Sequence, residues 1–161
     1  MKTGFSKTER LCSYDLQQML FAGKQHLFCY PFRVVYLAFE ADHPPYNPRL
    51  ASLADLPLAL QKKQPVANRH LLGPFPAQCL ISAPAKRFKR AVDRNRIKRL
   101  TREAFRKNKS PFYAFLKENN LFCLLAFIYS ASEILPFREI ESKMAVSLQQ
   151  LTNKLQATKT T

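Results

Sequence analysis

The sequence predicts one domain over residues 1–161, of the α+β class, in which a strongly basic helix crosses between two strands. Three observations support this prediction. Apolar residues follow strand patterns in Tyr30–Glu40 and Leu121–Tyr129. Apolar residues recur at helical spacing in Phe88–Arg106 and in the segment that begins at Pro136. With 161 residues, 47% of them hydrophobic, the chain can bury a core and is too apolar for overall disorder.

The first expected elements are a short helix and a strand. Ser13 can cap a helix over Tyr14–Ala22, and Gly23 can end it. Tyr30–Glu40 is rich in Val, Phe and Tyr, which favours a strand. One face of this strand would hold Phe32, Val34, Tyr36 and Ala38, and the other Arg33, Val35, Leu37 and Phe39. Because both faces are largely apolar, we expect the strand to be central in its sheet.

Residues 42–76 differ in character from the rest of the chain. They hold seven of the eleven prolines and no long alternating pattern. We interpret them as an insertion between two strands, in which Leu50–Lys62 favours helical turns interrupted at Pro57. A loop of this length is usually functional or mobile, but an insertion without a role in the core activity fits the sequence equally well.

The second half of the chain predicts two strands and two helices. Gln78–Ala83 is expected to form a short strand that leads into the basic segment, and Pro111–Asn119 to extend or follow the basic helix after a break near Ser110. Leu121–Tyr129 is a continuous apolar strand, which predicts a central position. Pro136 opens the last helix, and residues 157–161 are expected to form a frayed tail. The apolar face of that helix would consist of Ile140, Met144, Leu148, Leu151 and Leu155.

The basic segment concentrates the charge of the chain. Between Lys86 and Lys109 there are twelve Lys and Arg residues and two acids, so this segment carries +10 of the total +15. On a helix, Ile97, Leu100, Ala104 and Phe105 share one face, and Arg94, Lys98 and Arg102 form a ridge beside it. Seven of the twelve cations are Arg, whose planar group binds phosphate oxygens through two hydrogen bonds.

Two interpretations of this segment remain open from charge alone. A solvated basic face without a partner is the ordinary explanation of a charge run. A polyanion partner explains better why so many like charges are held together, because neighbouring cations repel each other on a helix. We therefore expect a binding surface for nucleic acid, with strong dependence on salt.

The other residue types favour no catalytic site within the protein. Four widely spaced cysteines without a CxxC pair predict reduced thiols rather than a zinc site. The three histidines are isolated, and the acids form no obvious pair, so we expect no catalytic residues and no bound metal. Asp93 and Glu103 fit local ion pairs on the helix better than metal ligands. The N-terminus lacks the apolar stretch of a signal peptide, which predicts a cytoplasmic protein with no membrane partner.

The order of residues within the basic segment resembles a known family. Residues 90–106, with Arg94-Asn95-Arg96 followed by Ile97-Lys98-Arg99 and Arg102, resemble the signature helix of the bacterial ribonuclease P protein subunit. Phe5-Ser6-Lys7 with Arg10-Leu11 resembles the N-terminal segment of that family. The resemblance covers roughly residues 1–40 and 78–155.

This resemblance implies a fold and a role. The fold would be a two-layer α-β sandwich of the ribosomal-protein-S5-like type, with a left-handed βαβ crossover at the basic helix. The role would be that of a protein subunit that binds the catalytic RNA of ribonuclease P and the 5′ leader of precursor tRNA. The RNA would carry the endonucleolytic reaction and its Mg²⁺ ions, with no cofactor bound by the protein.

The same resemblance assigns site residues. Contacts with the catalytic RNA would come from Lys86, Arg87, Lys89, Arg90, Arg94, Asn95, Arg96, Lys98, Arg99, Arg102 and Arg106. Lys7 and Arg10 would add N-terminal contacts. Candidates for the leader cleft are Leu16, Leu20, Phe32, Arg33 and Tyr36, with leucines where many members of the family have phenylalanines.

Two alternatives stay open at this point. A ribosomal or other structural-RNA-binding protein without a catalytic role would have the same charge and lack an active site. A self-sufficient nuclease would need acidic metal ligands or a His/Lys pair, which the sequence does not supply in an obvious form.

Overall fold

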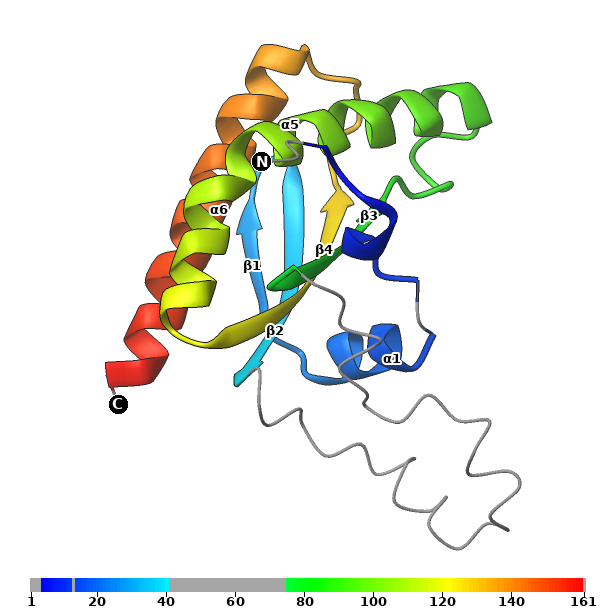
Figure 1. Ribbon diagram of the computed structural model, residues 1–161. Helices are drawn as coiled ribbons and strands as arrows, with labels where there is room; N and C mark the ends of the chain where they lie inside the picture. Colours follow the sequence, from blue (N-terminus) through cyan, green and yellow to red (C-terminus); the bar gives the residue numbers. More distant parts are fainter. Residues whose placement is uncertain (1–3, 13, 41–74, 161) are drawn as a thin grey trace, which may run out of the picture.

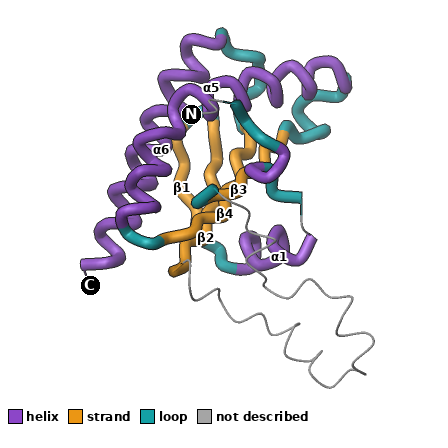
Figure 2. Tube along the Cα trace, in the orientation of Figure 1, coloured by secondary structure: helices purple, strands orange, loops and turns teal. Residues whose placement is uncertain are grey.

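The computed structural model describes residues 4–12, 14–40 and 75–160, which form one four-stranded sheet with helices on both faces (Figures 1 and 2). The order across the sheet is β1-β2-β4-β3. The strands are β1 (His26–Cys29), β2 (Phe32–Glu40), β3 (Ala77–Ser82) and β4 (Leu121–Tyr129). The predicted central positions of β2 and β4 are confirmed, because each has a neighbour on both sides.

Helices α5 (Ala91–Glu118) and α6 (Phe137–Thr160) cover one face of the sheet, and α1 (Tyr14–Ala22) packs on the other. The core under α5 and α6 includes Phe32, Val34 and Phe127 of the central strands. The smaller core under α1 includes Val35, Leu124 and Ala126. The alternation of β2 therefore divides its residues between the two faces as the sequence predicts. The α+β class is confirmed, and the sheet with α5 and α6 on one face is consistent with the predicted two-layer sandwich, to which α1 adds one short helix on the other face.

The basic helix connects two parallel neighbouring strands. β3 pairs with β4 in parallel, with Cys79 opposite Leu125 and Ile81 opposite Phe127. β4 pairs with β2 in the antiparallel direction. The crossover of the basic helix between two strands is thus confirmed, while its left-handed sense remains a prediction.

Some of the predicted elements and boundaries were wrong. Strand β1 was not expected, because four residues are too short to show a clear alternation; residues 30–31 form the turn, and β2 begins at Phe32. Helix α5 extends through Pro111 to Glu118 without the break expected near Ser110, since Pro111 is exposed while Phe112, Tyr113 and Leu116 anchor the following turn in the core. A proline inside a helix removes one backbone hydrogen bond and bends the helix, and α5 bends along its length in Figure 1.

Residues 157–160 also differ from the prediction of a frayed tail. They continue α6, and the ammonium of Lys159 donates to the backbone oxygen of Asn119 at 2.9 Å and to its Oδ1 at 3.3 Å. This contact fastens the end of α6 to the turn that follows α5. The five apolar residues predicted along α6 are all buried.

The predictions for residues 42–74 lie outside the described residues, including the helical turns over 50–62, and so do the cap at Ser13 and residue 161. Within the described part of the chain, no helix combines the length and apolar character needed to cross a membrane.

Candidate nucleic-acid interface

The loop before α5 is fixed by Arg94. One terminal nitrogen of its guanidinium donates to the backbone oxygens of Phe88 at 2.7 Å and Lys89 at 2.8 Å. The Phe88 ring is buried against Tyr129, with 5.8 Å between the ring centroids. Arg94 was predicted to contact RNA, but the structure uses its side chain to hold this loop. The loop in turn presents four exposed cations, Lys86, Arg87, Lys89 and Arg90.

Four exposed residues lie at helical spacing near the start of α5: Val92, Asn95, Arg96 and Arg99. We call these four residues the outer face. The two arginines make no hydrogen bond or ion pair with any described residue, so their guanidinium groups are available to a partner. Val92 is 67% exposed and was missed in the sequence analysis, although its i, i+3, i+4 and i+7 relation to the others was a usable signal. An exposed apolar side chain beside free cations offers a nonpolar contact within a charged surface.

The opposite face of α5 attaches the helix to the sheet. Ile97, Ala104 and Phe105 are fully buried, as predicted, and Leu100 is partly buried. Thr101 also lies on this face, where its hydroxyl donates to the backbone oxygen of Ile97 at 2.8 Å. This packing fixes the direction in which the outer face points.

The remaining predicted cations of α5 are less available. Lys98 and Arg102 are half-buried at the border between the two faces. Arg106 is held by Glu103, whose carboxylate accepts hydrogen bonds of 2.9 and 2.6 Å from the guanidinium. This hydrogen bond from Arg106 lowers the pKa of Glu103. The predicted local ion pair is therefore confirmed for Glu103. Asp93 lies in the first turn of α5, where a negative charge interacts favourably with the helix dipole.

Lys109 does not belong to the basic surface. Its side chain is 7% exposed and pairs with Glu9, which is fully buried. Counting Lys109 in the basic patch was therefore wrong, because its charge is neutralised in the interior. The nearby N-terminal residues Lys7 and Arg10 are both exposed, and the Arg10 guanidinium lies 5.9 Å from the centre of the Phe5 ring.

The predicted leader-cleft residues divide between the two faces of the sheet. Leu16 and Leu20 are buried under α1, where they pack with Val35 and Leu124. Two of the predicted contacts require correction. Phe32 is fully buried, and Tyr36 is packed against the same core under α5 and α6. Neither ring lies on the α1 face, because residues 32, 34 and 36 alternate away from it.

Arg33 is the predicted cleft residue that remains exposed on the α1 face. Its cross-strand partner is Phe28 of β1, which is 63% exposed and was not predicted because β1 itself was missed. Directly opposite residues in an antiparallel pair point to the same face of the sheet. A cation and an aromatic ring thus lie side by side on the open part of this face.

The cysteines and acids of the described residues do not cluster as metal ligands. No group of three potential metal ligands occurs there. Cys29, Cys79 and Cys123 are buried free thiols, whereas Cys12 is an exposed free thiol. Burial raises the pKa of Cys79 and Cys123, so these thiols are unreactive at neutral pH.

The fold and the outer face of α5 define a small basic α+β protein of the kind that binds a polyanion. Comparison with known proteins makes the class specific. The family model described as Ribonuclease P matches residues 5–152. The ribonuclease P protein components of two strains of Porphyromonas gingivalis are each 32% identical over 145 residues, covering 90% of this chain and 84% of the relative.

The chain therefore belongs to the ribonuclease P protein family. Its role is that of the protein component of a ribonucleoprotein that acts in tRNA processing, which implies an RNA partner. The resemblance inferred from residues 90–106 is confirmed.

Proposed function

We propose that this protein binds the catalytic RNA of ribonuclease P through the outer face of α5 and the loop that precedes it. The observation that carries this proposal is the pair Arg96 and Arg99, whose side chains are exposed and free of described partners on a helix that is rigidly docked. Guanidinium groups bind phosphate oxygens strongly when they are not already paired. Lys86, Arg87, Lys89 and Arg90 extend the same surface before the helix.

In this proposal the RNA performs the hydrolysis. The protein contributes no catalytic residue, and the Mg²⁺ ions of the reaction are bound by the RNA subunit. The protein neutralises phosphates near the site of cleavage, which lowers the concentration of Mg²⁺ that the RNA requires. This role implies that the protein is cytoplasmic, in the same compartment as the precursor tRNA.

The single-stranded 5′ leader of precursor tRNA would lie on the α1 face of the sheet. Arg33 supplies a cation there, and the exposed ring of Phe28 supplies a surface on which a base can stack. Leu16 and Leu20 form the apolar floor under α1 rather than a stacking surface, since both are buried.

The decisive experiment is cleavage of a precursor tRNA by the cognate ribonuclease P RNA at low Mg²⁺, with and without the protein. We expect a large protein-dependent gain in accurate cleavage at the 5′ end. Salt-sensitive binding to many structured RNAs without such a gain would favour the alternative, a structural-RNA-binding protein. Cleavage by the protein alone would contradict the assignment of catalysis to the RNA.

A further inference from the structure

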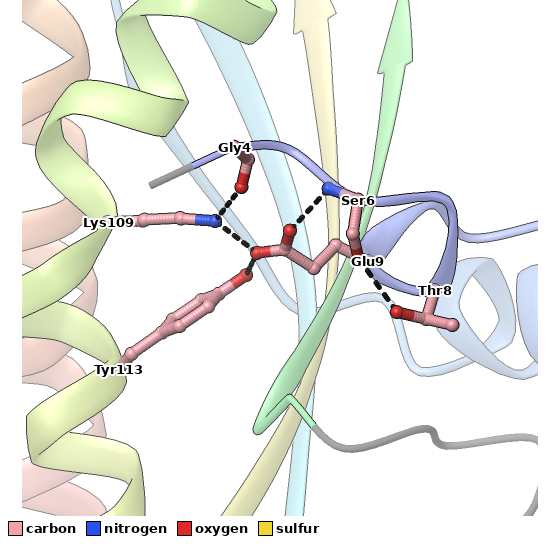
Figure 3. A network of polar contacts seen from close by, with 6 residues as sticks. All are labelled: Gly4, Ser6, Thr8, Glu9, Lys109 and Tyr113. Atoms are coloured by element: carbon pink, nitrogen blue, oxygen red, sulfur yellow. Dashed lines mark hydrogen bonds and ion pairs between the residues drawn. The ribbon is translucent and has the colours of Figure 1, made fainter. Parts of the chain in front are cut away.

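A buried polar cluster joins the N-terminal segment to α5 (Figure 3). The Oε1 atom of Glu9 accepts hydrogen bonds from the Lys109 ammonium at 2.5 Å and from the Tyr113 hydroxyl at 2.7 Å. Its Oε2 atom accepts from the backbone N–H of Ser6 at 2.6 Å. Lys109 also donates to the backbone oxygen of Gly4 at 2.8 Å. Residues about one hundred positions apart in the sequence are thus connected directly.

The cluster is satisfied as a charged unit. Burial alone would raise the pKa of Glu9, but the hydrogen bonds from Lys109, the Ser6 amide and Tyr113 together lower it. Burial, and then the hydrogen bond to Glu9, raise the pKa of Tyr113, so its hydroxyl remains a donor. Among the described residues, no buried side-chain nitrogen or oxygen lacks a hydrogen-bond partner. A buried ion pair adds little net stability compared with apolar packing, but removing one partner leaves an uncompensated buried charge.

The surroundings of Lys109 bring a third segment into the cluster. Its ammonium lies 5.5 Å from the centre of the Phe75 ring and 5.3 Å from that of Tyr113. Phe75 lies just before β3. One lysine therefore contacts the N-terminal segment, the residues that lead into β3 and the helix that carries the outer face.

The segment held by this cluster carries two exposed cations. Lys7 and Arg10 lie on either side of Glu9 in the chain, and both point away from the core while Glu9 points into it. The next residue, Leu11, is buried, and its N–H donates to the backbone oxygen of Cys79 on β3 at 3.0 Å. The anchoring of Glu9 and Leu11 in the interior thus holds the backbone that carries Lys7 and Arg10.

We propose that Glu9, Lys109 and Tyr113 are positioning residues, which hold Lys7 and Arg10 beside α5 so that the N-terminal segment and the helix form one surface for RNA phosphates. This inference rests on the proposed function. None of the three residues touches the RNA. They act through the segment that Glu9 anchors.

The test measures the coupling between the cluster and the two cations. The K7A/R10A change is introduced into the wild-type protein and into the E9Q/K109M variant, which removes both buried charges together. Affinity for the cognate ribonuclease P RNA is measured over a series of salt concentrations. Thermal unfolding establishes that each protein is folded. The matched control is K107M/E141Q, which removes the partly exposed ion pair between α5 and α6 at 3.6 Å.

In the wild-type protein and in the control, we expect K7A/R10A to lower affinity about tenfold and to reduce the salt slope by roughly 1–2. In the E9Q/K109M variant, the same change should have almost no further effect, because the cations are already misplaced. A purely structural cluster would not produce this loss of coupling. Equal losses in all three proteins, or no loss in the wild type, would overturn the proposal.

Two additional variants keep the outcomes distinguishable. If E9Q/K109M does not fold, Y113F replaces it, because Y113F removes one hydrogen bond to Glu9 and keeps the ion pair. In the Y113F protein, K7A/R10A should lower RNA affinity less than in the wild type. An undiminished loss of affinity would overturn the proposal. R96A/R99A tests the proposed function separately. If that variant weakens binding but K7A/R10A does not, only the positioning role fails; if neither weakens binding, the proposed function fails as well.

Discussion

Replacing Arg96 and Arg99 with alanine should weaken RNA binding without destabilising the protein. Both side chains are exposed and make no hydrogen bond or ion pair with a described residue, so their removal breaks no observed contact. Surface substitutions of this kind change the free energy of unfolding by about 0.5 kcal/mol or less. Each phosphate contact contributes roughly 0.7–0.9 to the slope of log affinity against log salt. Loss of both contacts should therefore reduce the slope by roughly 1.4–1.8.

The assay is binding of the cognate ribonuclease P RNA at several salt concentrations, combined with thermal unfolding of the free protein. The matched control is K117A/K154A, which removes the same charge from exposed positions at the end of α5 and on α6. If the control reduces the slope as much as R96A/R99A, the effect comes from net charge rather than from the outer face. A fall in thermal stability of R96A/R99A would show that these arginines are structural.

Three further predictions concern the contacts that support this surface. Arg94→Ala removes two hydrogen bonds to the loop before α5. It should lower the free energy of unfolding by about 1–3 kcal/mol and speed hydrogen exchange in that loop. Unchanged stability with weaker RNA binding would instead identify Arg94 as a direct contact. Ile97→Ala should lower the free energy of unfolding, measured by chemical denaturation, by about 2–5 kcal/mol because Ile97 is fully buried. The control Val92→Ala, at a 67% exposed position, should leave it nearly unchanged. Equal effects would mean that the helix faces are misassigned. The pKa of Glu9 is lowered below its ordinary value of 4.5, so the ionised carboxylate stabilises the fold above that pH, and this stabilisation is lost as the pH falls below it. The free energy of unfolding should therefore fall less steeply with acid for E9Q/K109M than for the wild type. Identical profiles would exclude an ionised pair.

Local pattern was sufficient for much of the fold. The apolar run Leu121–Tyr129 and the spacing of Ile97, Ala104 and Phe105 depend only on neighbouring residues, and both were predicted correctly. Strand β1 was missed because four residues carry too little periodicity. The break expected near Ser110 did not occur, since tertiary packing of the turn that follows Pro111 outweighs the loss of one backbone hydrogen bond.

The candidate site was predicted less completely, because the availability of a side chain depends on its partners in space. Arg94 and Lys109 look like any other cation of the basic segment in the sequence. The structure assigns Arg94 to the loop before α5 and Lys109 to Glu9 in the interior. Phe32 and Tyr36 looked suitable for stacking, but their face of the sheet is covered by α5 and α6.

The sequence by itself determined the family, the position of the basic helix and the face by which that helix docks. These properties follow from residue order and from the period of the helix, which are local. Only the tertiary structure decided which cations are free for a partner and how the N-terminal segment is held. Those properties depend on hydrogen bonds and burial between residues as distant as Glu9 and Lys109, whose pairing leaves no pattern in the sequence.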